Sequence, residues 1–209
     1  MTTAFRWLAA ALMAAPAFAG DLFDHPRTPA QAQATLHAAM PGHAQVQVLR
    51  GRFSQRKYLR EIPRPLVSAG EFVLVRDRGI WWHSQTPLDS ELTLTPHGMI
   101  QRNAGTQARP AGIEAAAAIF FALFALDLDT LAHSFDLFEM GSDSHWLLGL
   151  RPRDAALANW FERATISGGE RVEQVTLVEA AGDRTEINLE AAEQPLWSLT
   201  PAERQRFEP

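Results

Sequence analysis

Seven histidines are the side chains in this sequence best suited to bind a metal ion or to transfer a proton at neutral pH. They are His25, His37, His43, His83, His97, His133 and His145. No two of them follow an HxH or HxxxH spacing, which would place two imidazoles on one face of a strand or a helix. The spacing therefore favours scattered surface or turn histidines over a metal site.

Other catalytic signatures are also missing from the sequence. Asp127 and Asp129 have the spacing that begins a calcium loop, but the glycine and glutamate that such a loop needs do not follow, so we expect the pair to end an apolar helix. There is no GxSxG elbow, P-loop, GxGxxG motif or cysteine. We therefore expect no enzyme, cofactor or metal site, although two carboxylates brought together only by folding would leave a hydrolase open.

Length and composition indicate one ordinary globular domain. The chain has 209 residues, of which 46% are hydrophobic and 21% are charged, and these values exclude general disorder. The longest uncharged apolar runs, Trp7–Phe18 and Ala115–Leu126, are shorter than the roughly 20 residues of a membrane-spanning helix. A net charge of −5 provides no broad basic field, so we expect no nucleic-acid partner.

Residues 1–19 have the features of a secretory signal peptide. Arg6 supplies the positive start, Trp7–Ala15 is an apolar core, and Ala17–Ala19 fits the small-x-small pattern read by signal peptidase. We expect cleavage near Ala19, a mature single domain over 20–209, and export, with the bacterial periplasm as the favoured location. A buried N-terminal helix is the alternative.

The pattern after the signal peptide predicts a mainly β protein with some α-helix. A helix begins after Thr28 and ends before Pro41, and a short final helix begins after Thr200. Between them, alternating apolar and polar residues are separated by turn signals about every ten residues, which is typical of an antiparallel meander. The predicted strands are 46–58, 69–76, 80–84, 88–95 and 99–103, followed by 135–140, 146–151, 159–167, 174–179 and 185–190.

One apolar helix, Ile113–Leu126, interrupts the two groups of strands. A sheet of this length must curl or close, and a helix across its mouth would enclose a concave space. The helix is either a permanent plug or a lid over a removable ligand. The residues predicted to line the space are Leu49, Phe53, Phe72, Leu74, Ile80, Trp82, Leu92 and Leu94 on the strands, with Ile119, Phe120, Leu123 and Phe124 on the helix.

Two basic features have alternative interpretations. Arg76 shares a strand face with Phe72 and Leu74, so its charge needs partners. It is either solvated at the strand end or crosses the cavity mouth to latch the helical lid. The stretch 50–60 contains four arginines and one lysine, which form either a solvated strand face or a contact with anionic headgroups or an acidic partner.

The strand motifs resemble the LolA-like family of periplasmic outer-membrane lipoprotein carriers. Leu49–Gln55 is similar to the family's apolar-x-small-x-Phe-x-Gln strand, and Gly70–Arg76 and Ile80–Trp82 continue the resemblance. Leu92–Leu94, the His97–Gly98 turn, an apolar helical segment and the Gly182–Asp183 turn follow in the family's order. The resemblance covers roughly residues 30–192.

The resemblance implies an unclosed antiparallel β-barrel, or half-barrel, covered by a helical lid over an apolar cavity for acyl chains. It implies transfer of lipoproteins from an inner-membrane release complex to an outer-membrane acceptor, and Arg76 falls where the family has an arginine that bonds to the lid. Asp77 and the proline-rich loop Leu59–Pro65 depart from the family pattern. They indicate a divergent branch, some members of which handle other acylated molecules. We expect a monomer. A non-carrier envelope interaction protein with a filled core and a periplasmic hydrolase are the alternatives.

Overall fold

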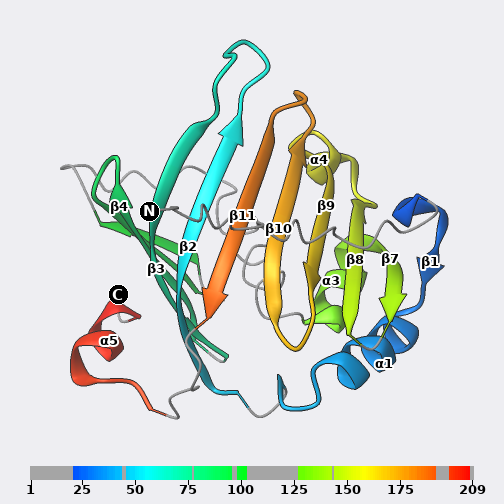
Figure 1. Ribbon diagram of the computed structural model, residues 1–209, viewed down its shortest axis with the longest axis horizontal. Helices are drawn as coiled ribbons and strands as arrows, with labels where there is room; N and C mark the ends of the chain where they lie inside the picture. The colour runs from blue at the N-terminus through cyan, green and yellow to red at the C-terminus, as the bar shows by residue number, and fades with distance from the viewer. Residues whose placement is uncertain are drawn as a thin grey trace, which may run out of the picture.

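In the part of the chain that the structure describes, eleven strands form a single antiparallel sheet (Figure 1). The computed structural model describes residues 21–43, 46–76, 78–95, 98–102, 127–142, 144–191 and 198–207. The strand order is β1-β7-β8-β9-β10-β11-β2-β3-β4-β5-β6, and the two outer strands, β1 and β6, do not pair with each other. The sheet is therefore an unclosed half-barrel, as predicted. The predicted signal peptide and the predicted lid helix 113–126 lie outside the described residues.

The bounds of the elements follow the predicted pattern closely. The strands are β1 (Pro26–Arg27), β2 (Val48–Tyr58), β3 (Leu66–Val75), β4 (Gly79–Thr86), β5 (Ser90–Thr95), β6 (Gly98–Arg102), β7 (Phe135–Ser142), β8 (His145–Pro152), β9 (Phe161–Gly168), β10 (Val172–Glu179) and β11 (Arg184–Ala191). The helices are η1 (Leu22–Asp24), α1 (Pro29–Ala39), α3 (Leu128–Ser134), α4 (Ala155–Ala158) and α5 (Pro201–Arg206). Among the described helices, none is long and apolar enough to cross a membrane.

The two aspartates lie at the start of a described helix. Asp127 begins α3, because its side chain accepts a hydrogen bond from the backbone N–H of Thr130 at 3.1 Å, whereas the apolar helix that the pair was predicted to end lies outside the described residues. Aspartate is a favoured N-cap residue, since it satisfies a backbone donor that the first helical turn leaves free. The two aspartates thus mark a helix start.

Helices α1 and α3 pack together on the inner face of the sheet, against β7 and β8. A capping box between Thr28 and Gln31 fixes the start of α1, as the sequence predicted. Leu36 of α1 and Leu128 and Leu131 of α3 are buried in the same cluster as the inner-facing side chains of the strands. These helices therefore fill one half of the concave face.

Aromatic rings cover part of the other half of the concave face, over β2, β3 and β4. Phe53 pairs with Gly70 across β2 and β3, and Gly51 pairs with Phe72. A Cβ atom on Gly51 would lie 2.7 Å from the Phe72 ring, so this ring occupies the space that a side chain would need. The Phe53 ring stacks on Trp82 with a centroid distance of 3.7 Å. The two glycines thus allow large rings to lie close to the sheet.

The outer face of β2, β3 and β4 carries a second, smaller core that holds the C-terminal helix. Val48, Val73, Val75 and Trp81 cluster there with Phe207, which follows α5. The guanidinium of Arg206 lies 3.5 Å from the centroid of the Trp81 ring. Alternation along the strands predicted which side chains face outward, but it did not predict that α5 covers them.

A bidentate ion pair joins this helix to the sheet. The Nε and Nη2 atoms of Arg50 donate hydrogen bonds to the two carboxylate oxygens of Glu203, each at 2.7 Å. The hydrogen bond from Arg50 lowers the pKa of Glu203 from 4.5 to about 2. The charged carboxylate is therefore stabilised in the folded protein relative to the unfolded chain.

We expect Glu203→Gln to lower the free energy of unfolding at pH 7 by about 1–3 kcal/mol, because it removes a charge-assisted pair. The pair stabilises the native state fully above about pH 4.5, the unfolded pKa, and this contribution is lost as the pH falls towards 2. Urea unfolding at several pH values measures the difference. Glu162→Gln is the matched control, because Glu162 pairs with Arg163 on the exposed surface. An equal loss of stability at pH 7 and pH 2 would contradict the prediction.

Candidate functional site

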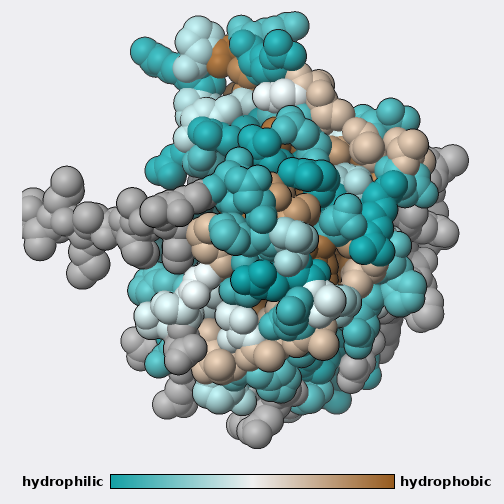
Figure 2. Space-filling model, turned by 90° about the vertical axis from the view of Figure 1, so that its right-hand side faces the viewer, coloured by the Kyte–Doolittle hydropathy of each residue, from teal (hydrophilic) through white to brown (hydrophobic). Residues whose placement is uncertain are grey.

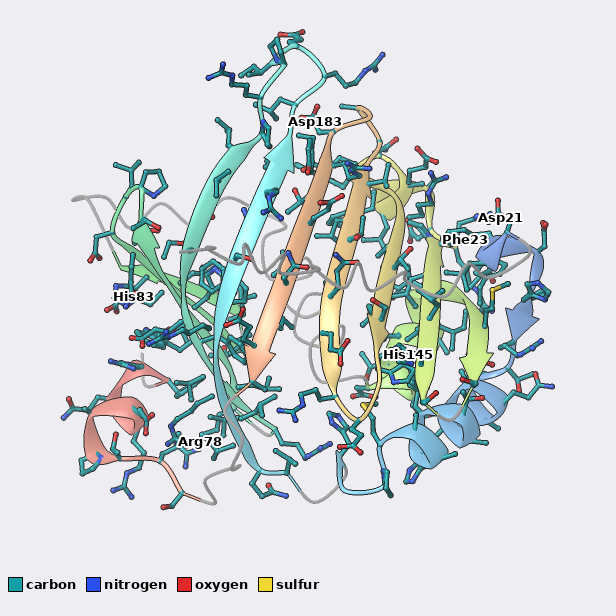
Figure 3. The ribbon with its side chains drawn as sticks, viewed as in Figure 1. Asp21, Phe23, Arg78, His83, His145 and Asp183 are labelled. Carbon is teal, nitrogen blue, oxygen red and sulfur yellow. The ribbon has the colours of Figure 1, made fainter. Side chains whose placement is uncertain are left out.

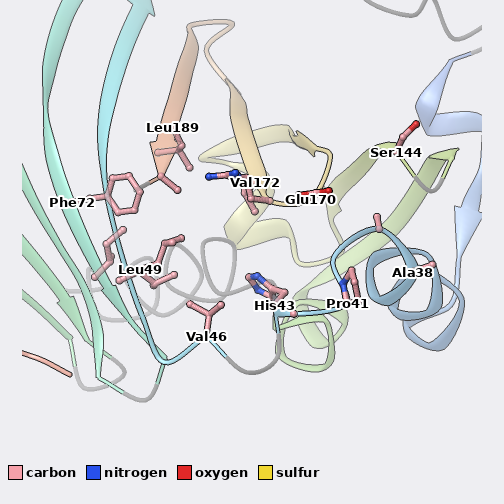
Figure 4. A pocket seen from close by; sticks show the side chains of 16 residues that line it. Ala38, Pro41, His43, Val46, Leu49, Phe72, Ser144, Glu170, Val172 and Leu189 are labelled. Atoms are coloured by element: carbon pink, nitrogen blue, oxygen red, sulfur yellow. The ribbon is translucent and has the colours of Figure 1, made fainter. Parts of the chain in front are cut away.

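A cavity of about 750 Å³ lies between the C-terminal end of α1 and the inner face of β2, β3, β4 and β11 (Figure 4). Its apolar lining comes from strand residues, from the C-terminal end of α1 and from the connection between α1 and β2. These residues are Ala38, Ala39, Pro41, Val46, Leu49, Phe72, Leu74, Ile80, Val172, Leu189 and Ala191. The volume falls within the range of about 300–1,000 Å³ typical of small-molecule sites.

Polarity in the cavity increases toward its opening. Phe72, Ile80 and Leu189 are buried at the inner end. Ser144, Glu170 and Arg171, by contrast, are exposed at the turns between β7 and β8 and between β9 and β10. Among the described lining residues, charged side chains occur only at this rim. The arrangement suits a ligand with an apolar body and a polar end.

The structure brings together four of the eight strand residues predicted to line the cavity. Leu49, Phe72, Leu74 and Ile80 all contribute to its wall. The other four pack beside it within the core cluster, where Phe53 stacks on Trp82. They are Phe53, Trp82, Leu92 and Leu94. The four predicted lid residues, Ile119, Phe120, Leu123 and Phe124, lie outside the described residues.

Sequence reasoning missed the part of the wall that comes from distant segments. Leu189 on β11 lies in the cavity because β11 pairs with β2, with Leu189 opposite Phe53. Alternation along β11 could have shown which face Leu189 occupies, but not that this strand lies next to β2. Val46 and Val172 come from segments at strand ends, where alternation carries no signal.

Arg76 lies directly behind the cavity wall. Its Nε donates to the carbonyl oxygen of Val46 at 3.1 Å, and its Nη2 donates to the carbonyl oxygen of His43 at 2.6 Å. Both acceptors belong to residues that line the cavity. Arg76, Leu49 and Leu74 are among the residues that line a small void of about 10 Å³. Arg76 thus ties the connection between α1 and β2 to the end of β3.

The predicted contact between Arg76 and the lid helix falls on residues outside those described. Among the described residues, the guanidinium donates to backbone carbonyl oxygens of the connection between α1 and β2. Because these bonds hold a segment of the cavity wall, Arg76 is positioned to influence how wide the cavity opens.

In the described part of the chain, no group of three or more histidine, aspartate or glutamate side chains could hold a metal ion. Among the described lining residues, His43 is the one histidine and Glu170 is the one carboxylate. What the described lining offers a ligand is chiefly an apolar surface that excludes water.

Comparisons with known proteins find similar solved structures, whereas no protein-family model and no curated protein matches the sequence. The LolA superfamily protein from Nitrosomonas europaea has 8% identity and a TM-score of 0.43, with 82% of this chain and 96% of that chain covered. An outer membrane lipoprotein-sorting protein domain from Vibrio parahaemolyticus has 8% identity and a TM-score of 0.38, with 87% and 97% covered. The Pseudomonas aeruginosa MucA/MucB complex has 15% identity and a TM-score of 0.44, with 83% and 62% covered.

Proposed function

We propose that this protein is a non-catalytic carrier that shelters acyl chains in its apolar cavity while they cross an aqueous compartment. The observation that carries the proposal is the cavity of about 750 Å³, apolar inside and with its charged lining residues at the rim. An acyl chain fits the interior, and the polar group to which it is attached meets the rim.

The energetics explain why such a carrier needs both an apolar container and a way to open it. Each methylene group removed from water contributes about 0.8 kcal/mol, so one long acyl chain gains on the order of 10 kcal/mol. A cargo held this firmly leaves slowly unless the protein itself favours the empty form. The two hydrogen bonds from Arg76 to the cavity wall can supply part of that bias.

The cargo and route that we propose follow from the family resemblance. Lipoproteins, or another acylated molecule, would be received from an inner-membrane release complex and passed to an outer-membrane acceptor. The predicted signal peptide is consistent with a function in the periplasm. We propose that the protein acts there as a monomer.

Mass spectrometry of the protein purified from the periplasm, expressed from its full-length sequence, tests the proposal. We expect acylated molecules to co-purify in near-stoichiometric amounts and to be released by denaturation. A fluorescent fatty acid should bind to the delipidated protein and be displaced by an unlabelled one. The absence of both co-purified acyl chains and fatty-acid binding would refute the carrier function.

A further inference from the structure

The large hydrophobic side chains that the described structure leaves exposed are gathered at one end of the sheet. They are Ile62 (45% exposed), Leu66 (53%), Val67 (56%), Leu88 (76%) and Trp160 (73%). The first three belong to the β2–β3 hairpin, which projects beyond the sheet (Figure 1). Figure 2 shows brown side chains between teal ones at this upper tip.

Strand pairing establishes that the three segments share this end. Leu66 lies opposite Lys57 where the hairpin begins, and Thr86, two residues before Leu88, lies opposite Ala69 at the same end of β3. Trp160 precedes β9, and its carbonyl oxygen accepts a hydrogen bond from the backbone N–H of Ala180 at 3.1 Å.

The turn between β10 and β11, which contains Ala180, is also hydrogen-bonded to the β2–β3 hairpin. The Nη1 of Arg60 donates to the carbonyl oxygen of Ala181 at 2.8 Å, and the backbone N–H of Arg60 donates to Asp183 at 3.1 Å. The five exposed side chains therefore belong to segments at the same end of the sheet, which we call the apolar end.

The charge of the hairpin differs in sign from that of the whole protein. Residues 56–67 contain four basic side chains and one acidic side chain, whereas the full chain has a net charge of −5. Arg56, Arg60 and Arg64 are exposed. Lys57 is paired with Glu179 at 2.8 Å. Because the Arg60 side chain is bonded to the β10–β11 turn, Arg56 and Arg64 are the exposed arginines that the hairpin presents near Ile62, Leu66 and Val67.

We propose that the apolar end docks the protein onto the surface of an anionic lipid bilayer. The exposed apolar side chains come from three separate segments, which suits a flat, deformable surface better than a single binding groove. Tryptophan is favoured at the boundary between headgroups and acyl chains, and arginine is attracted to anionic headgroups. The rim residues Ser144, Glu170 and Arg171 lie at the opposite ends of their strands, so docking leaves the cavity opening uncovered.

Binding to lipid vesicles tests this proposal with the purified protein expressed from its full-length sequence. We expect co-sedimentation with vesicles of phosphatidylglycerol and phosphatidylcholine, weaker binding to phosphatidylcholine alone, and a decrease in binding with added salt. The double variant Ile62→Ser/Leu66→Ser and the variant Arg64→Glu should each reduce the binding severalfold to about tenfold. These side chains are exposed, so the fold should persist.

Arg78→Glu is the matched control for charge, because Arg78 is exposed at the opposite end of the sheet (Figure 3). It should bind vesicles like the unmodified protein. The fluorescence of Trp160 should shift to shorter wavelength on vesicles, and Trp160→Phe should remove that shift. No binding to anionic vesicles, or equal losses in Arg64→Glu and Arg78→Glu, would overturn the proposal. Loss of a protein partner in the hairpin variants, with vesicle binding unchanged, would also overturn it.

Acyl-chain binding in solution is measured separately with the fluorescent fatty acid. The hairpin variants should keep it, since their substitutions lie outside the cavity lining. Failure of vesicle docking and failure of the carrier function are therefore distinguishable.

Discussion

Leu49→Asp is expected to weaken the binding of a fluorescent fatty acid by about 100-fold or more. Leu49 is half-buried and contributes to the cavity wall. Water can hydrate an aspartate at this position while the cavity is empty, so the fold should survive. An acyl chain in the cavity would displace that water and leave the charge unsolvated, which costs several kcal/mol. A titration followed by fluorescence measures the change in the dissociation constant.

Leu88→Asp is the matched control for this prediction. It makes the same chemical change at a residue that is 76% exposed and outside the cavity lining. It should leave the dissociation constant nearly unchanged, and circular dichroism should confirm that both variants remain folded. If folded Leu49→Asp bound the fatty acid as tightly as the unmodified protein, acyl chains would not occupy this cavity.

The strands were predictable because each has one face in the core and turn residues at its ends. In β3, for example, buried Phe72 and half-buried Leu74 face the cavity, whereas Val73 and Val75 pack against the outer cluster around Phe207. What could not be predicted is the pairing of β11 with β2, which joins the two meanders into one sheet. That pairing is non-local, so neither turn signals nor alternation within one strand reveals it.

The elements that were missed are short. β1 has two residues, η1 has three and α4 has four, so none is long enough to show a helical or strand period. Such elements depend on contacts made by the rest of the fold. The backbone N–H of Glu139 in β7, for example, donates a hydrogen bond to the backbone carbonyl oxygen of His25, beside β1.

The candidate site was only partly predictable, because alternation identifies a face and not the part of that face that stays open. Phe53 and Phe72 both point to the inner side and both stack with Trp82, at centroid distances of 3.7 and 6.1 Å, yet of the two only Phe72 lines the cavity. The difference arises from ring packing in three dimensions. For Arg76, the strand ends one residue earlier than predicted, and the side chain reaches back to the connection between α1 and β2.

Arg76→Leu is expected to slow the release of a bound fatty acid by about 10- to 100-fold while leaving the protein folded. We expect widening of the cavity to move its wall at His43 and Val46, whose carbonyl oxygens accept hydrogen bonds from Arg76. Bonds from a charged donor contribute about 1.5–3 kcal/mol each and stabilise the narrow form. Without them the wide form becomes more populated, so cargo enters readily but leaves slowly. Stopped-flow displacement of the fluorescent fatty acid measures the release rate.

Two further variants separate this effect from a general loss of charge or stability. Arg78→Leu removes an exposed arginine from the same turn and should release the fatty acid at the unmodified rate. Arg76→Lys keeps the charge but lacks the planar group that reaches both carbonyl oxygens, so its release rate should be intermediate. Release from Arg76→Leu at the unmodified rate, measured below its melting temperature, would show that the bonds to His43 and Val46 only support the fold. A slow release shared by Arg76→Leu and Arg78→Leu would assign the effect to charge at this turn instead of to the cavity wall.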